Sequence, residues 1–110
     1  MTMMTFDEFK KAEIKIGTIL SVEKVPDTDK LLRFSINLGE ENPRQILSGI
    51  AEYYPDPSVL VGKQVPVLTN LPTRTIRGFE SQGMVLYVVG EGFLTTLEPG
   101  REIPPGTPVH

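Results

Sequence analysis

Hydrophobic and polar positions alternate along most of the chain, as they do in strands that bury one face. The pattern predicts five strands, over residues 14–23, 32–38, 44–49, 64–70 and 83–89. Gly17 lies where the first strand would tolerate a bulge or a sharp coil, and Pro66 marks the fourth as an edge strand or a bulge. The residues expected to share one face of the first strand are Ile14, Ile16, Thr18, Leu20 and Val22.

Short helices are predicted at two places where the alternation stops. Thr5 and Glu8 have the spacing of a capping box, which predicts a short helix over residues 6–12. Asp56 followed by Pro57 combines an N-cap with proline at the first helical position, so a helical turn is predicted over residues 57–60. Residues 71–79 are predicted to be a loop, and residues 93–97 to pair in a hairpin-like tail.

The order of these elements indicates a fold. Three strands, a short helix and two further strands follow the order of the five-stranded OB barrel. A small sandwich or an SH3-like barrel would not need helical residues between the third and fourth strands. We therefore predict an all-β, five-stranded OB-fold barrel with a short N-terminal helix. The 110 residues amount to one domain, with a core at about 13–90 and a C-terminal extension at 91–110.

Composition excludes several classes of function. The chain is 39% hydrophobic and 23% charged, as globular proteins are. It has no apolar run near the roughly 20 residues that span a bilayer and no signal-peptide pattern, so a cytoplasmic protein without membrane association is expected. Cysteine is absent and the only histidine is His110, which excludes disulfides, Cys/His zinc sites and histidine-base mechanisms. No cofactor is expected.

Three motifs invite an enzymatic interpretation, and each is weak. Ser81 lies in a G-x-x-S-x-G segment, whereas a nucleophile elbow needs G-x-S-x-G and a histidine. The segment 90–92 (GEG) lacks the third glycine and the helix of a dinucleotide site. Asp27 and Asp29 are more readily explained by a turn than by a divalent cation. A binding protein is therefore favoured over an enzyme.

Charge is distributed unevenly. The net charge is −3, which taken whole argues against a polyanionic partner. Between Pro57 and Phe79, however, there is no acidic residue, while Lys63, Arg74 and Arg77 lie there. That segment carries +3, and the rest of the chain carries −6. The basic segment is equally consistent with chance and with a functional patch.

A nucleic-acid surface fits the remaining polar residues. OB barrels bind nucleic acid on one face, with basic side chains on phosphates and small polar, apolar or aromatic groups on bases. Residues of these kinds gather around the two loop regions that would border such a face: Lys30, Arg33, Ser48, Asn70, Arg74, Arg77, Ser81 and Met84.

Five blocks of the sequence resemble those of a known protein family. They are residues 14–19 (IKIGTI), 26–32 (PDTDKLL), 44–50 (RQILSGI), 70–71 (NL) and 77–84 (RGFESQGM). In this order they resemble the stand-alone tRNA-binding domain family. That family includes the C-terminal module of methionyl-tRNA synthetase, its separately encoded version and the secretion-associated chaperone CsaA. The similarity runs from about Thr5 to the C-terminus.

The resemblance implies a function and a set of site residues. It implies an obligate homodimer that recognises the bent outer corner of folded tRNA and acts in trans for a methionyl-type synthetase. Lys30 would contact phosphate, and Gly49 and Gly83 would let backbone approach closely. The complete set of expected RNA-binding residues is Lys30, Arg33, Ser48, Gly49, Asn70, Arg74, Arg77, Ser81, Gln82, Gly83 and Met84.

Two further expectations accompany the resemblance. The N-terminal helix and the proline-rich tail at 93–109 are too large to tuck into so small a barrel, so a partner copy would cover them. The alternative function is a CsaA-like export chaperone that binds unfolded preproteins in an apolar groove lined by Met84, Phe79, Tyr53 and Tyr54. The acidic net charge slightly favours it, because preproteins carry basic signal regions.

Overall fold

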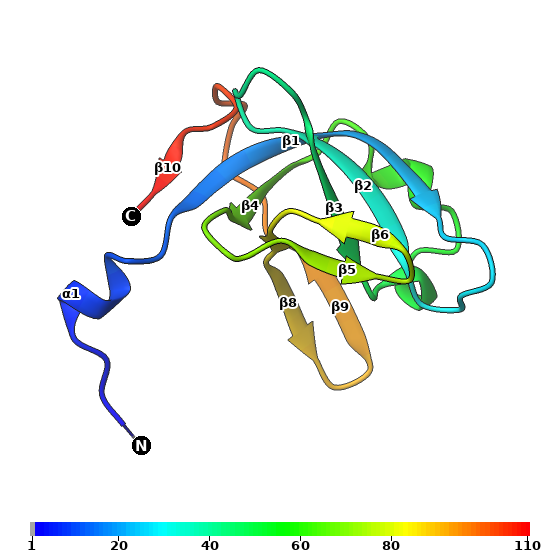
Figure 1. The fold of residues 1–110 in the computed structure, drawn as a ribbon, viewed down its shortest axis with the longest axis horizontal. Coiled ribbons are helices and arrows are strands. Elements are labelled where there is room, and N and C mark those ends of the chain that lie inside the picture. Colours follow the sequence, from blue (N-terminus) through cyan, green and yellow to red (C-terminus); the bar gives the residue numbers. More distant parts are fainter. Residues whose placement is uncertain (1) are drawn as a thin grey trace.

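Five antiparallel strands form a nearly closed barrel in the computed structural model, which describes residues 2–110 (Figure 1). They lie in the order β3-β2-β1-β4-β7, and β3 approaches β7 to close the barrel. The predicted all-β OB-type barrel is therefore confirmed. The barrel strands are β1 (Ile14–Lys24), β2 (Leu32–Asn37), β3 (Arg44–Ser48), β4 (Gln64–Leu68) and β7 (Met84–Val85).

Smaller elements surround the barrel. The helix α1 precedes β1, two 3₁₀ turns join β3 to β4, and two hairpins and a short C-terminal strand complete the chain (Figure 1). These elements are α1 (Phe6–Phe9), the turns Ala51–Tyr53 and Pro57–Leu60, the pairs β5 (Arg74–Ile76) with β6 (Phe79–Ser81) and β8 (Tyr87–Gly90) with β9 (Phe93–Thr96), and β10 (Pro108–Val109).

The predicted helix signals are confirmed, with a shorter N-terminal helix than expected. The Glu8 N–H donates to the Thr5 hydroxyl (3.1 Å) and the Thr5 N–H donates to the Glu8 carboxylate (3.0 Å), which is the capping box. This lowers the pKa of Glu8. Asp56 caps the Pro57–Leu60 turn by accepting from the Ser58 N–H at 3.1 Å.

The core is filled by side chains that point into the barrel. In β2, the buried residues Leu32, Phe34 and Ile36 alternate with the half-buried Arg33 and Ser35, so one face of the strand is inside and the other outside. The largest fully buried side chains are Phe34, Ile19, Leu32, Ile36, Ile46, Leu60, Val65 and Val67.

The bulge in β1 is at Leu20 and not at Gly17, where only the alternative of a sharp coil is left. The register against β2 shifts between Ile19 and Ser21, which exposes 46% of Leu20 and buries Ile19. The predicted face of β1 is therefore divided: Ile16 and Thr18 lie beside the C-terminal segment, whereas Val22 packs against the core cluster. Gly17 has a different role: a Cβ there would collide with the Ile36 side chain. Its missing side chain lets β1 coil closely over β2.

Pro66 lies inside the sheet, so the predicted edge strand or bulge is wrong. β4 lies between β1 and β7, and the register of Pro66 with Ile16 is unbroken. Ile16 turns its backbone away from β4, accepting from the Gly106 N–H (2.7 Å) and donating to the Thr107 carbonyl (2.9 Å). No N–H is therefore needed from Pro66 toward β1, and its carbonyl accepts from the Leu86 N–H at 3.1 Å.

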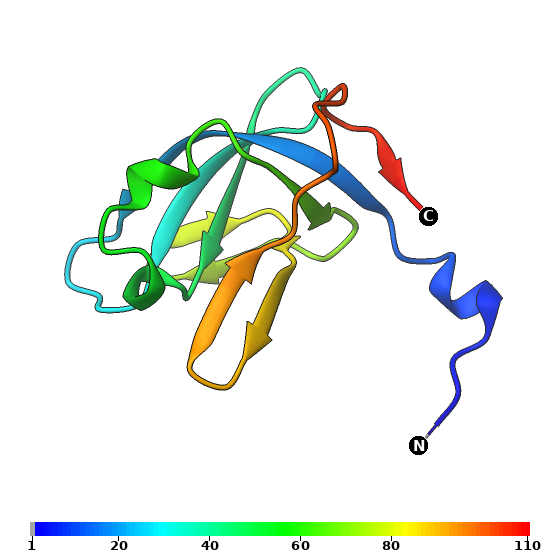
Figure 2. The ribbon, with the colours of Figure 1, turned by 180° about the vertical axis from the view of Figure 1, so that it is seen from behind.

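The predicted single strand at residues 83–89 is interrupted at Leu86. Its first part, β7, stays in the barrel, and its second part, β8, leaves to form a hairpin with β9 (Figure 1). The predicted pairing of residues 93–97 is confirmed by this hairpin. From β9 the chain runs behind the barrel to β10, which pairs with the start of β1 (Figure 2).

The helices of residues 2–110 are all too short or too polar to cross a membrane.

Candidate nucleic-acid interface

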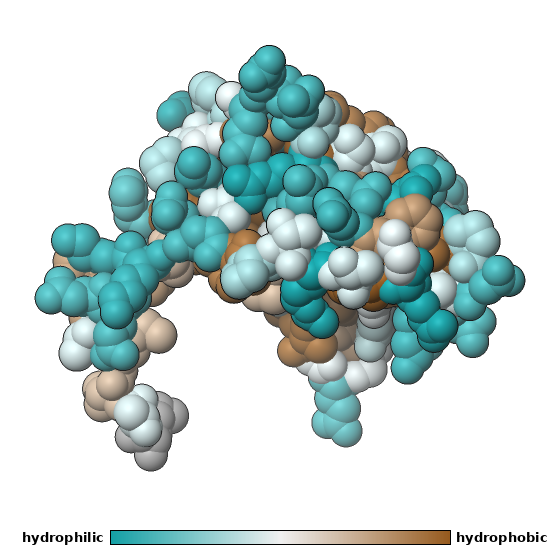
Figure 3. Space-filling model, in the orientation of Figure 1, coloured by the Kyte–Doolittle hydropathy of each residue, from teal (hydrophilic) through white to brown (hydrophobic). Residues whose placement is uncertain are grey.

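The outer face of β1–β3 and the β5–β6 hairpin together form the candidate interface. The hairpin lies over β3, in front of it in Figure 1 and behind it in Figure 2. Figure 3 shows mostly hydrophilic side chains over these elements, with a few apolar ones among them. The segment predicted as a loop, residues 71–79, is thus partly strand. Arg77 (φ 53°) and Gly78 (φ 83°) form a tight turn with two positive φ angles, as type I′ hairpins require.

Residues 80–82 attach the hairpin to β3. The Gln82 N–H donates to the Gln45 carbonyl (2.8 Å), and the Gln45 N–H donates to the Gln82 side-chain oxygen (3.0 Å). The side-chain amide of Gln45 also donates to the Glu80 carbonyl (2.9 Å). Ser81 is only 5% exposed, and its hydroxyl accepts from the Leu47 N–H at 3.0 Å. Ser81 and Gln82 therefore use their polar groups within the protein.

Arg44 holds both ends of the segment that carries the hairpin. Its Nη1 donates to the carbonyl of Thr69 (2.7 Å) and to that of Gln82 (3.2 Å). The other side of the guanidinium makes two bonds to the Glu40 carboxylate, at 2.8 and 2.9 Å. The hydrogen bond from Arg44 lowers the pKa of Glu40. One planar cation thus fixes the hairpin against β3.

Three predicted cations lie exposed at the border of this face. Arg74 pairs in register with Ser81 on the hairpin, and Arg77 is at its tip. Lys30 lies in the loop between β1 and β2, where its carbonyl accepts from the Ala51 N–H at 2.9 Å. Within residues 2–110, no carboxylate forms an ion pair with any of the three. Their charges are therefore available to an anionic partner.

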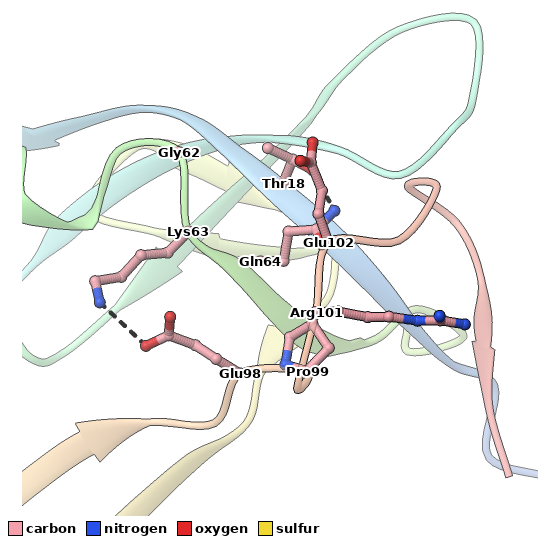
Figure 4. A pocket seen from close by; sticks show the side chains of 8 residues that line it. All are labelled: Thr18, Gly62, Lys63, Gln64, Glu98, Pro99, Arg101 and Glu102. Carbon is pink, nitrogen blue, oxygen red and sulfur yellow. Dashed lines mark hydrogen bonds and ion pairs between the residues drawn. The ribbon is translucent and has the colours of Figure 1, made fainter.

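Lys63, the third cation of the acid-free segment, belongs to another part of the molecule. Its ammonium contacts the Glu98 carboxylate at 3.1 Å in a pocket of about 340 Å³ (Figure 4). Arg101 and Glu102 also line this pocket, so its charge is mixed. The local excess of +3 inferred from the sequence is thus divided between two places, and the hairpin has only two of these charges.

Arg33 is predicted as an RNA contact and is already engaged on two sides. Its Nη2 lies 3.0 Å from the Glu23 carboxylate, its cross-strand partner. Its guanidinium carbon lies 4.7 Å from the centre of the Phe79 ring, a cation–π distance. Arg33 therefore differs from the three cations whose charges are not neutralised.

Ser48 ends β3 and Gly49 follows it, beside the half-buried Tyr87. The Tyr87 hydroxyl donates to the Ser48 hydroxyl at 3.0 Å. Gly49 is exposed, and a side chain there would meet no atom within 4 Å in the described structure. Ser48 thus links β3 to β8, whereas the backbone at Gly49 is open to a ligand.

Tyr87 gives the protein a testable response to alkali. Burial raises the pKa of Tyr87 to about 12, above the usual tyrosine value of about 10. The neutral hydroxyl therefore contributes stability that is complete below pH 10 and is lost as pH rises toward 12. We expect urea titrations to show that wild type loses about 1–2 kcal/mol more than Tyr87→Phe between pH 9 and 11. Parallel losses in the two proteins would contradict this assignment.

Asn70, Gly83 and Met84 have three different surroundings. The Asn70 side chain accepts from the Glu13 N–H (2.9 Å) and donates to the Lys11 carbonyl (2.6 Å), so it anchors the N-terminal segment. Gly83 has a φ of 135° and packs against the core, where a Cβ would lie 3.0 Å from the Leu68 carbonyl. Met84 is exposed on β7.

The predicted residues therefore fall into two groups. Lys30, Gly49, Arg74, Arg77 and Met84 present open groups at the surface, and Arg33 is partly open. The polar groups of Ser48, Asn70, Ser81 and Gln82 are bonded within the protein, and Gly83 is packed against the core. Sequence reasoning missed Arg44 and Gln45 as hairpin supports, and no local pattern could have revealed them, because their partners lie 25–38 residues away.

Among residues 2–110 the structure contains no group of three or more acidic, histidine or cysteine side chains that could hold a metal ion. Asp27 has a positive φ of 63°, as turn residues do.

Sequence comparison identifies relatives over nearly the whole chain. The family model described as "Putative tRNA binding domain" matches residues 14–108. The methionine–tRNA ligase of Enterococcus faecalis is 48% identical over 102 residues, which are 92% of this chain and 15% of the ligase. That of Methanococcoides burtonii is 46% identical over 109 residues, 98% of this chain and 16% of the ligase. The chain thus spans about a sixth of these relatives.

Solved structures agree with the sequence relatives. A MetRS related protein from Pyrococcus horikoshii superposes with a TM-score of 0.92 at 32% identity, covering all of both chains. The chaperone CsaA from Bacillus anthracis superposes with a TM-score of 0.87 at 31% identity, covering 99% of this chain and all of that one. Family model, relatives and structures agree, and the chain belongs to the tRNA-binding domain family found in methionyl-tRNA ligases.

Proposed function

We propose that this chain is a non-catalytic module that binds folded tRNA by its shape and acts in trans for a methionyl-type aminoacyl-tRNA synthetase in the cytoplasm. The observation that carries the proposal is the placement of Lys30, Arg74 and Arg77. They border one face of the barrel and have no carboxylate partner among the described residues. The family membership and the similarity to methionine–tRNA ligases support the same conclusion.

The two groups of predicted residues have different roles in this proposal. The open groups of Lys30, Arg74, Arg77 and Met84 meet the RNA, and Gly49 allows close approach. The internally bonded residues Ser48, Asn70, Ser81, Gln82 and Gly83 hold the hairpin and its neighbours in position. Three phosphate contacts on an acidic protein give weak binding that depends steeply on salt, with about 0.7–0.9 in the log–log slope per contact.

Replacement of Arg74 tests the charge contacts. We expect Arg74→Ala to weaken tRNA binding several-fold at low salt and to lower the salt slope by about 0.7–0.9. Lys63→Ala is the matched control, because it removes the same charge from a residue paired with Glu98 away from the hairpin. Filter binding across a salt series measures both quantities. Equal losses in the two variants would exclude Arg74 as a contact.

A homodimer is part of the proposal. The helix α1 has only four residues and buries none of them, and Phe6 is 72% exposed. Helices this short are not stable alone in water. Figure 3 shows the N-terminal segment standing away from the barrel, with a hollow between them. An apolar groove of about 340 Å³ between α1 and β10 is lined by Phe6, Phe9, Pro108 and Val109 among others. A second copy, meeting α1 and the 91–110 extension, would cover these side chains.

The dimer is tested by charging the groove. We expect sedimentation equilibrium to give wild type a mass twice the 12.2 kDa of one chain. The double variant Phe6→Asp/Phe9→Asp should shift toward the monomer, because it would bury two carboxylates of each copy in an apolar interface. Leu20→Asp, at an exposed apolar position outside the groove, is the control. A wild-type monomer at micromolar concentration would contradict the proposal.

A chaperone function is the second candidate, because CsaA is among the similar structures. Of its expected lining, Met84 and Tyr53 are exposed, but Tyr54 packs against the core and Phe79 lies against Arg33. Suppressed aggregation of a denatured client at stoichiometric ratio, without tRNA binding, would favour this function. An unchanged rate of aggregation alongside tRNA binding would eliminate it.

A further inference from the structure

Two rows of side chains cross the outer face of β1, β2 and β3. The register places Ser21 opposite Ser35, and Ser35 opposite Gln45. In the next row Glu23 is opposite Arg33, and Arg33 is opposite Leu47. A cavity of about 430 Å³ lies over these rows and is lined by Ser21, Glu23, Arg33, Ser35, Pro43 and Gln45.

Arg33 forms one wall of this cavity as a flat, stacked group. One face of its guanidinium lies against Phe79 at 4.7 Å, and one edge is held by Glu23 at 3.0 Å. Arg33 lines the cavity and Phe79 does not, and 30% of the Arg33 side chain remains exposed. Phe79 is itself fixed, because the hairpin that carries it is bonded to Gln45 through Glu80. Part of the Arg33 side chain is therefore accessible to a ligand.

The chemistry of the cavity disfavours an anion. Glu23 already neutralises Arg33, and its own carboxylate would repel a phosphate. The hydroxyls of Ser21 and Ser35 and the side-chain oxygen of Gln45 take part in no hydrogen bond within residues 2–110. A flat, uncharged group with both donors and acceptors matches such a site. Unpaired bases of RNA have this character, and they stack on arginine planes.

We infer that Arg33 is a stacking platform for one unpaired base of the bound RNA, in a three-layer arrangement of Phe79, Arg33 and the base. Its serine and glutamine neighbours contact the edge of that base. The inference rests on the proposed function and names one subsite of it: Lys30, Arg74 and Arg77 act on phosphates, and Arg33 acts on a base.

Nucleosides test the subsite without the rest of the RNA. We expect adenosine at millimolar concentration to shift the amide NMR signals of Ser21, Ser35 and Gln45, and inorganic phosphate to leave them unchanged. Arg33→Lys keeps the positive charge but loses the planar guanidinium group, so it should weaken adenosine binding about five-fold or more. Phe79→Leu is a second variant that should also weaken adenosine binding. A dispersed amide spectrum establishes that each variant is folded.

Other outcomes would overturn the subsite. The first is equal shifts with phosphate and with adenosine. The second is adenosine binding that Arg33→Lys does not weaken, and the third is shifts caused by an unfolded peptide but not by adenosine.

The salt series separates this inference from the proposed function. Arg33→Lys should weaken tRNA binding without changing its salt slope, in contrast to Arg74→Ala. If tRNA binds and adenosine does not, the subsite is wrong and the function stands; adenosine binding without tRNA binding supports the subsite alone.

Discussion

Replacing Gly106 by alanine is expected to destabilise the protein by about 2–5 kcal/mol. Gly106 has a φ of 89°, and an alanine Cβ there would collide with the Leu38 carbonyl oxygen, which is backbone and cannot rotate away. Positive φ costs an L-residue about 1–2 kcal/mol, and overpacking adds roughly 1–3 kcal/mol. The bonds joining Gly106 and Thr107 to Ile16 would also be strained, which would loosen β10 from β1.

Gly62 offers a matched control for this experiment. Its φ is 88°, and a Cβ there would meet no atom within 4 Å in the described structure. Gly62→Ala therefore carries the conformational cost without the collision, and we expect about 1–2 kcal/mol. Urea unfolding of both variants measures the difference. If the two losses in the free energy of unfolding agree within about 0.5 kcal/mol, the close packing of the C-terminal segment against Leu38 is contradicted.

Arg44→Lys is expected to release the hairpin. Lysine cannot reproduce the fork that bonds the Thr69 and Gln82 carbonyls and Glu40 together. Hydrogen bonds to charged groups contribute about 1.5–3 kcal/mol, so we expect a loss of roughly 2–3 kcal/mol in the free energy of unfolding. Amide hydrogens of residues 74–81 should exchange at least about ten-fold faster, because the hairpin would open locally.

The control for Arg44 is Glu40→Gln. It removes the exposed ion pair but leaves the two carbonyl bonds in place, so the expected cost is below about 1 kcal/mol. Because Arg44 lowers the pKa of Glu40, the ion pair weakens only as pH falls toward and below the ordinary range of a glutamate. Equal exchange rates at residues 74–81 in the two variants would show that Arg44 does not hold the hairpin.

Local signals in the sequence predict much of the fold. The capping box at Thr5, the Asp56–Pro57 turn and the alternation in β2 involve residues a few positions apart, and all are confirmed. The bulge at Leu20 is different, because it arises from the register of β1 against β2. Arg77–Gly78 was a usable signal for the hairpin that replaced the predicted loop, since glycine favours positive φ.

The candidate site shows the limit of residue type as a guide. Arg74 and Ser81 are neighbours across one hairpin, yet Arg74 is exposed and Ser81 is buried with its hydroxyl bonded to the Leu47 N–H. Asn70 likewise uses its amide on backbone groups 57 and 59 residues away. Only the three-dimensional structure distinguishes polar residues that face a ligand from those that position the surface.

Binding of folded tRNA by the wild-type protein tests the central claim most directly. The measurement is a titration of labelled tRNA across a salt series, with an unstructured RNA of the same length as competitor. We predict saturable binding that tightens as salt falls, with a log–log slope of about 2–3 for three phosphate contacts, and preference for the folded tRNA. Absence of saturable binding at low salt, or equal affinity for the unstructured RNA, would contradict recognition of tRNA by shape.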